Sequence, residues 1–380
     1  MDTLILLQHY WWAVIALLAS LLVFLLFVQG GQGMLYELGR TAAERTMIVN
    51  STGRKWELTF TTLVTFGGAF FAAFPLFYST SFGGAFYVWM LILLVMVIQA
   101  VAYEFRRKPN NIFGERFYNI LLVINGIGAP LLIGTAVGTM FTGAEFTVNR
   151  ANLSIIGGES TISQWVSPWY GLEALADMRN VCLGLALVFL SRMLAAQYFM
   201  NDIDDRTLFG RSRKAMLINA VPFVIFFVAF LLSILVADGW AVGADGIITI
   251  EPYKYLHNML AMPVVTALLL AGVVSVLASV VLGYFRSSRK AIWFGGIGTV
   301  VTVWMLLLTL GFNGTAYYPS LVDAQSSLTI QNSSSGLFTL KTMTIVSALV
   351  PFVLAYIWYV WREVNKHKIS QQTANDDHAY

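Results

Sequence analysis

The stretch Trp11–Val28 has the sequence WWAVIALLASLLVFLLFV and carries no charged side chain. About 20 consecutive apolar residues form a helix that crosses the hydrocarbon core of a bilayer. No Lys or Arg precedes the stretch, and its apolar run is longer than that of a cleavable signal peptide. The stretch therefore predicts a membrane-spanning helix near the start of the chain.

The composition of the whole chain extends this prediction. Of the 380 residues, 58% are hydrophobic and 11% are charged, whereas soluble domains are about 25% charged. A soluble enzyme and a disordered chain are thereby excluded, and the long runs differ from the short alternating segments of an outer-membrane barrel. The single cysteine, Cys182, excludes an intrachain disulfide framework and a cysteine-rich metal site.

Further apolar runs predict an all-α polytopic membrane protein with about nine transmembrane helices. We expect residues 1–380 to form a single integral-membrane domain that closes with a helix at 341–361 and a tail at 362–380. The predicted spans are Trp11–Val28, Leu58–Phe77, Phe86–Tyr103, Phe117–Thr139, Ala176–Phe199, Met216–Ala237, Leu260–Tyr284, Ile292–Phe312 and Thr342–Tyr359.

A weak internal similarity connects two of these spans. The stretch Leu21–Gln29 resembles Leu185–Met193, which suggests a pseudo-repeat of residues 1–142 and 172–313. Shared apolar composition is the alternative explanation, since it produces such matches by itself.

The basic residues alternate between the two sides of the predicted membrane. Eighteen of the 23 Lys and Arg lie in the odd-numbered connections or in the tail, and the even-numbered connections hold only Arg150, Lys254 and Lys341. Short cytoplasmic loops are enriched in Lys and Arg. The pattern predicts an outside N-terminus and a cytoplasmic C-terminus. It also accounts for the net charge of +3, so we expect no nucleic-acid partner.

Ionisable residues within or beside the spans are the first candidates for function. Glu57 opens the second span, where the helix dipole also favours an acid, and Glu104 closes the third, where an ion pair with neighbouring Arg residues is the alternative. Arg192 lies deeper, in the fifth span. It either extends to the cytoplasmic face or pairs with an acid on another helix.

The histidines and glycines narrow the classes of function. His9 precedes the first predicted span and His257 lies in an outer loop, so we expect no haem ligand in the spans.

A secondary transporter, the alternative class, would need matched broken helices; Gln29–Gly33 is a candidate break without a counterpart in the fifth span. The small residues of the fourth span form one face that predicts close intrachain helix packing: Gly126, Pro130, Gly134 and Gly138.

Several motifs together resemble one known family. They are Trp11-Trp12, Trp56-Glu57 at the family's Trp-Asp position, the GGAFFAAFP stretch at 67–75, Glu104–Lys108, and Tyr318-Pro-Ser320 followed by a serine-rich loop. In these features, and in its nine-span spacing, the chain resembles subunit II of the bacterial cytochrome bd quinol oxidases over essentially its whole length. It departs from the family at Gln29, near which relatives carry acids, and at Lys55-Trp56-Glu57, where relatives have His-Trp-Asp.

The resemblance implies a fold and a role. It implies two four-helix bundles plus one peripheral helix, in the bacterial cytoplasmic membrane. It also implies a partner, subunit I, that holds haem b and haem d, oxidises membrane quinol and reduces dioxygen. This chain would ligate no haem, stabilise subunit I and help to deliver cytoplasmic protons. A structural quinone or lipid and small single-helix accessory subunits are further expectations.

Candidate residues for the proton path follow from the topology and the resemblance. The carboxylate of Glu57 should face the bundle interior or a water-filled inlet, and Thr59 and Thr62 continue along the helix as hydroxyl relays, with Glu104 as a second acid. For the threonines, a hydrogen bond to the carbonyl four residues earlier is the alternative. Candidates for structural, partner, quinone or lipid contacts are Trp56, Gln29 and Arg192.

Overall fold

The computed structural model describes residues 2–149, 161–364, 366 and 368–370. Within this part of the chain, eight helices are long and apolar enough to cross a membrane, or up to nine if one bent pair counts as a single span. The predicted class, an all-α polytopic membrane protein, is confirmed. The first span is the longest, because α1 (Thr3–Leu25) continues into α2 (Phe27–Gly33).

Most predicted spans agree with the observed helices within a few residues. The first span begins at Thr3 instead of Trp11, and the largest difference is at α10, which begins at Arg206 instead of Met216. Asp205 caps the helix by accepting a hydrogen bond from the Leu208 amide at 2.8 Å, so a basic turn precedes the apolar run. The observed spans are α7 (Phe86–Phe105), α8 (Gly114–Thr142), α9 (Met178–Asp202), α10 (Arg206–Leu235), α12 (Pro263–Phe285), α13 (Ala291–Gly311), and the last pair, α15 (Leu337–Ser347) and α16 (Val350–Val364).

The second predicted span is broken near its end. Helix α5 (Trp56–Ala73) stops just before Pro75, and the chain then bends by 117° into α6 (Pro75–Phe77) and a π-helical turn (Tyr78–Gly84). Proline lacks an amide hydrogen and disfavours a helical conformation in the residue before it. The Phe74-Pro75 pair therefore ends the helix four residues before the predicted boundary.

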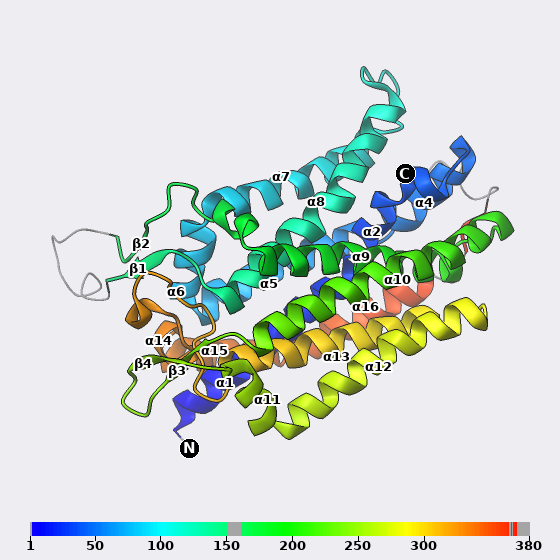
Figure 1. Cartoon of the computed structure of the whole chain (residues 1–380). Coiled ribbons are helices and arrows are strands. Elements are labelled where there is room, and N and C mark those ends of the chain that lie inside the picture. The colour runs from blue at the N-terminus through cyan, green and yellow to red at the C-terminus, as the bar shows by residue number, and fades with distance from the viewer. Residues whose placement is uncertain (1, 150–160, 365, 367, 371–380) are drawn as a thin grey trace.

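We divide the spans by chain order into a first group, blue to cyan in Figure 1, and a second group, green to yellow. In the first group α1 packs on α5, and α2 and α7 both pack on α8; in the second group α9 pairs with α10 and α12 with α13. Contacts of α8 with α9 and of α1 with α13 join the groups, and α15 lies against α1 and α5. The pseudo-repeat and the single-domain assignment stay predictions.

The small-residue face of α8 packs inside the chain, as predicted. A Cβ at Gly126 would lie 2.2 Å from the Gly33 amide nitrogen, and a Cβ at Gly134 would lie 2.7 Å from the Gly184 Cα. Glycine at these positions therefore permits α8 to approach α2 and α9 closely.

The two ends of the bundle differ in structure. One end, where the N-terminus lies, carries two antiparallel hairpins (Figure 1): β1 (Phe146–Val148) with β2 (Ser163–Trp165), and β3 (Gly239–Val242) with β4 (Ile248–Glu251). Two short helices lie at the other end, α3 (Leu35–Leu38) and α4 (Ala42–Gly53). We call this second end the basic end, because the Arg- and Lys-rich connections lie there. The remaining short helices are η3 (Leu172–Ala176), α11 (Lys254–Ala261), η4 (Ala324–Ser326) and α14 (Ile330–Ser333).

Candidate functional site

A cluster of buried amides lies between α2 and α7. Helix α2 directs Gln29 and Gln32 toward Gln99 of α7, and all three side chains are at most 1% exposed. The Nε2 atoms of Gln29 and Gln32 donate to the same oxygen, Gln99 Oε1, at 2.9 and 2.7 Å. The three-residue spacing of Gln29 and Gln32 places both on one face of the helix, so one acceptor serves both.

The hydrogen bonds continue from this cluster to the basic end. Gln32 Nε2 also donates to the Tyr103 hydroxyl at 2.9 Å, and that hydroxyl donates to Thr52 Oγ1 of α4 at 2.8 Å. The resulting chain, Gln29–Gln99–Gln32–Tyr103–Thr52, is called the amide ladder below. It connects the interior of the first span with a helix at the basic end.

Several carbonyl oxygens beside the ladder have no hydrogen-bond partner in the protein. Gln29 Oε1, Gln32 Oε1 and Asn125 Oδ1 are all buried and unpaired, although Asn125 Nδ2 donates to the Val95 carbonyl at 2.7 Å. Leaving a buried acceptor unpaired costs about 1–3 kcal/mol. These three oxygens are acceptors that bound water molecules could satisfy.

The second-span candidates lie apart from the ladder. Glu57 is exposed, so of the two expected positions of its carboxylate, the bundle interior is not the one observed, and a water-filled inlet stays a prediction. Thr59 is buried and donates to the Leu25 carbonyl at 3.2 Å, which ties α5 to α1. Thr62 donates to the Leu58 carbonyl at 2.6 Å, four residues earlier. Both hydroxyls thus bond to backbone, and for Thr62 this is the alternative raised by the sequence.

The two remaining charged candidates have different surroundings. Glu104 forms an exposed ion pair at 2.9 Å, but with Lys108 and not with the Arg residues beside it. Arg192 pairs with an acid on another helix, since its Nη2 lies 2.6 Å from an oxygen of Glu37 on α3 and its Nε donates to Asn219 at 2.7 Å. Arg192 is thereby a link between α9, α3 and α10.

Trp56 closes one side of the ladder. Its ring stacks on the ring of Tyr103, with centroids 5.7 Å apart and planes 17° apart. Gln29 is thus a member of the ladder and Trp56 packs against it, although the sequence indicated no connection between these two residues. The sequence analysis missed Gln99 and Tyr103, and it named Gln32 only as part of the Gln29–Gly33 stretch. A usable signal was present, because polar residues three or four positions apart in apolar runs share one helix face.

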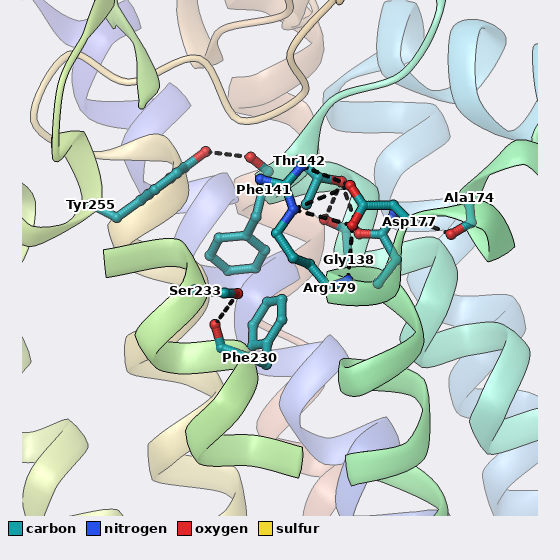
Figure 2. A network of polar contacts seen from close by, with 10 residues as sticks. Gly138, Phe141, Thr142, Ala174, Asp177, Arg179, Phe230, Ser233 and Tyr255 are labelled. Atoms are coloured by element: carbon teal, nitrogen blue, oxygen red, sulfur yellow. Dashed lines mark hydrogen bonds and ion pairs between the residues drawn. The ribbon is translucent and has the colours of Figure 1, made fainter. Parts of the chain in front are cut away.

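A second polar network lies at the N-terminal end of α9 (Figure 2). Asp177 caps α9 and accepts hydrogen bonds from the Arg179 backbone at 2.8 Å and from its guanidinium at 2.7 Å. Burial would raise the pKa of Asp177, but the hydrogen bonds from Arg179 outweigh it and hold that pKa below its usual range. Beside the pair, Thr142 Oγ1 donates to Asn180 Oδ1 at 2.8 Å. The network borders a cavity of about 540 Å³.

The two described histidines lie in different surroundings. Helix α1 begins earlier than predicted, so His9 lies inside it, with Nδ1 2.7 Å from the Ile5 carbonyl. His257 is exposed, with Nδ1 2.7 Å from Glu251. His367 and His378 lie outside the described residues. In the described part of the chain, no group of three or more His, Cys, Asp or Glu is arranged to hold a metal ion.

The fold defines a multi-pass helical membrane protein with a buried polar interior, and comparison with known proteins gives its family. Residues 7–364 match the family described as cytochrome bd terminal oxidase subunit II. Cytochrome bd ubiquinol oxidase subunit 2 of Bacillus subtilis is 28% identical and aligns over 93% of this chain and 96% of its own length. Cytochrome bd-I ubiquinol oxidase subunit 2 of Escherichia coli is 26% identical, with 97% of both chains covered.

A solved structure supports the same fold. The chain resembles the bd oxidase from Geobacillus thermodenitrificans with a TM-score of 0.64 at 14% identity, covering 95% of this chain and 99% of that one. The chain belongs to the cytochrome bd terminal oxidase subunit II family. It is therefore a subunit of a quinol oxidase, an oxidoreductase complex, and a multi-pass protein of the bacterial inner membrane.

Proposed function

We propose that this chain stabilises the haem-bearing subunit I of its oxidase and helps to deliver cytoplasmic protons to the site of dioxygen reduction. Haem b, haem d and quinol oxidation belong to subunit I in this proposal. The observation that carries the proton role is the amide ladder, which connects the basic end with the interior of the first span.

The physical argument concerns the cost of moving charge through a membrane protein. A proton in a medium of low dielectric constant needs continuous polar contacts. The side-chain amides of the ladder do not titrate, so protons would pass along water molecules bound to the two unpaired oxygens of the ladder and to that of Asn125 beside it. If the basic end is cytoplasmic, as the loop charges favour, the ladder begins on the side from which protons are consumed.

Glu57 stays a proposed uptake group at this end. It begins α5 next to Trp56, which stacks on the ladder's tyrosine. An exposed carboxylate exchanges protons readily with water, and a partner subunit would supply the enclosing wall that this chain does not. Thr59, Thr62 and Glu104 bond to backbone or to Lys108, and we assign them secondary roles at most.

Partner and lipid contacts have their own candidate surfaces. Helix α16 exposes Phe352, Tyr356 and Trp358, which suit a neighbouring transmembrane subunit, either subunit I or a single-helix accessory subunit. Between the two helix groups lies an apolar cavity of about 240 Å³, lined by residues such as Trp12 and Phe70. Its lining suits a lipid chain or the isoprenoid tail of a quinone.

The stabilising role is tested by purification. The chain should copurify with a haem-bearing membrane subunit, and reduced-minus-oxidised spectra of the complex should show its haems. Deleting this chain should lower the amount of haem-loaded partner in the membrane. Stoichiometric haem in the isolated chain would contradict the proposal.

The proton role is tested with two variants of the assembled oxidase. Tyr103→Phe removes the hydroxyl that joins Gln32 to Thr52, and Glu57→Gln removes the titratable group while keeping its size. Each should assemble with normal haem content and consume oxygen more slowly, whereas the control Tyr36→Phe, on an exposed residue, should not. Wild-type rates in both test variants would refute proton delivery by this chain.

Sidedness is tested with reporter fusions. A reporter that is active only in the cytoplasm, fused after Tyr380, should be active, and one that is active only in the periplasm should be silent. The reverse result would place the basic end outside.

A further inference from the structure

A buried carboxylate lies beside the basic-end terminus of the amide ladder. Asp202, the last residue of α9, is 3% exposed and accepts a hydrogen bond from Ser51 Oγ at 2.6 Å. Ser51 immediately precedes Thr52 on α4, and Thr52 is the last member of the ladder. The acid and the ladder are therefore hydrogen-bonded to two consecutive residues of one helix.

Charged and polar groups surround this carboxylate. Arg54 and Lys55, which follow α4, both act on it electrostatically, and Lys55 is itself only 2% exposed. The Tyr198 hydroxyl, one turn earlier on α9, donates to the Ser51 carbonyl at 3.4 Å. Burial disfavours the ionised carboxylate while the two cations and the Ser51 hydroxyl favour it. The carboxylate thus lies in a buried polar cluster at the basic end.

The C-terminal segment covers the same place. The Ile369 amide donates to the Asp202 carbonyl at 3.1 Å, and the Asp204 amide donates to the Ile369 carbonyl at 2.9 Å. Ile369 is 1% exposed, and the Trp361 ring lies over Lys55 with its centroid 5.0 Å from Nζ. Two elements from the end of the chain thus separate the acid from bulk water.

From this geometry we infer that Asp202 is the buried proton-loading group of the chain, with the segment at Ile369 limiting its exchange with water. The inference rests on the proposed function. A proton taken from the cytoplasmic side converts the carboxylate to a carboxylic acid. The acid then releases the same proton to water at the ladder and returns to the carboxylate, so no electron or other reactant is needed.

A purely structural role is the competing explanation. Asp202 joins α9, α4 and the C-terminal segment through its side chain and its backbone, and such a link would serve to fasten three elements together. The two roles differ in what they require of the side chain. A fastener needs its size and hydrogen-bonding capacity, whereas a loading group needs a titratable carboxyl.

The test compares Asp202→Asn with Asp202→Glu in the whole oxidase complex. Asp202→Asn should keep normal haem content and lower oxygen turnover on the order of tenfold or more, as expected when a proton-transfer group is removed. Asp202→Glu should recover most of the rate. The control is Asp204→Asn, two residues away on an exposed acid paired with Arg289 at 3.0 Å, which should turn over at the wild-type rate.

Each outcome decides the inference. A wild-type rate for Asp202→Asn overturns it, and so do equal rates for the Asn and Glu variants. If Asp202→Asn does not assemble, Ser51→Ala keeps the carboxyl and removes its hydrogen bond; a wild-type rate in that variant overturns the inference, and a slower rate at normal haem content supports it. If Tyr103→Phe is slow while Asp202→Asn is not, the proposed function stands and only the role of Asp202 falls.

Discussion

Helix α9 carries an aspartate at each end, and the two differ in how fully they are paired. Asp177, at the N-terminus, receives the backbone amide and the guanidinium of Arg179. Asp202, at the C-terminus, receives the Ser51 hydroxyl and is more deeply buried. A guanidinium that contacts both carboxylate oxygens fixes the charge, since protonation would break the pair. Asp202 accepts a hydrogen bond from a neutral hydroxyl and forms no such two-oxygen ion pair, so its protonation would break none. The comparison predicts a structural role for Asp177 and a proton-handling role for Asp202.

The largest effect is expected from a substitution that forces α2 away from α9, the helix that carries both aspartates. A Cβ at Gly30 of α2 would lie 2.1 Å from the backbone of Ser191, in the middle of α9. Gly30→Ala should therefore prevent assembly of the complex, seen as loss of the haem spectrum and of the chain from the membrane. Gly68→Ala, where a Cβ meets nothing within 4 Å, is the matched control. Normal assembly of Gly30→Ala would show that α2 and α9 can separate without cost.

A smaller but substantial effect is expected from the ladder. Gln99→Leu removes the acceptor shared by Gln29 and Gln32 and should destabilise the chain by about 1–3 kcal/mol for each donor left unpaired. Denaturant titration of the purified complex measures the change. Gln164→Leu, on an exposed residue at the opposite end, should leave stability unchanged. Equal stabilities of the two variants would mean that the ladder contributes nothing to the fold.

The Asp177 site should respond to mutation in stability but not in turnover. Asp177→Asn loses the ion pair with Arg179 and should lower stability by about 0.2–1 kcal/mol, because the pair is partly exposed. Oxygen turnover should stay at the wild-type rate, in contrast to Asp202→Asn. An Asp177→Asn oxidase with reduced oxygen turnover and unchanged stability would show that Asp177 and Asp202 do not differ in role.

The contribution of Asp177 to stability should depend on pH. The folded-state pKa of Asp177 is lowered, so its contribution to stability is present above the unfolded value of about 3.9 and disappears as pH falls through the folded value. Thermal unfolding of wild type and Asp177→Asn should therefore differ at neutral pH and converge below about pH 4. A difference that grows on acidification has the wrong sign for this mechanism.

The smallest effect is expected at Glu104. Its ion pair with Lys108 joins two exposed side chains, so Glu104→Gln should change stability by less than about 1 kcal/mol. It should also leave turnover unchanged. A marked loss of turnover at normal haem content would restore Glu104 as a proton-path residue.

Local patterns in the sequence predicted most of the fold. They predicted little of the site, because the site depends on contacts between residues that are far apart in the sequence. Apolar length gave the spans, and four-residue glycine spacing gave the contact face of α8, since both depend on residues close in sequence. The break at Phe74-Pro75 was readable from the same rules. Gln29 was singled out, but its partner Gln99 lies 70 residues away on another helix.

The sequence analysis did not identify the partners of the charged residues, for the same reason. The acid that pairs with Arg192 is Glu37, 155 residues earlier in the chain. Asp202 lies at the polar end of its span next to other acids, so in the sequence it resembles an ordinary loop residue. Only the fold shows that α4 and the C-terminal segment bury it.

The amide ladder also has a consequence for biogenesis. Gln29 and Gln32 enter the membrane with the first helix, but Gln99, their common acceptor, is synthesised about 70 residues later. At roughly 5–20 residues per second, translation takes several seconds to supply it. During that interval the insertion machinery or lipid headgroups must accommodate two polar side chains, and the first helix becomes fully compatible with hydrocarbon only when α7 arrives beside it.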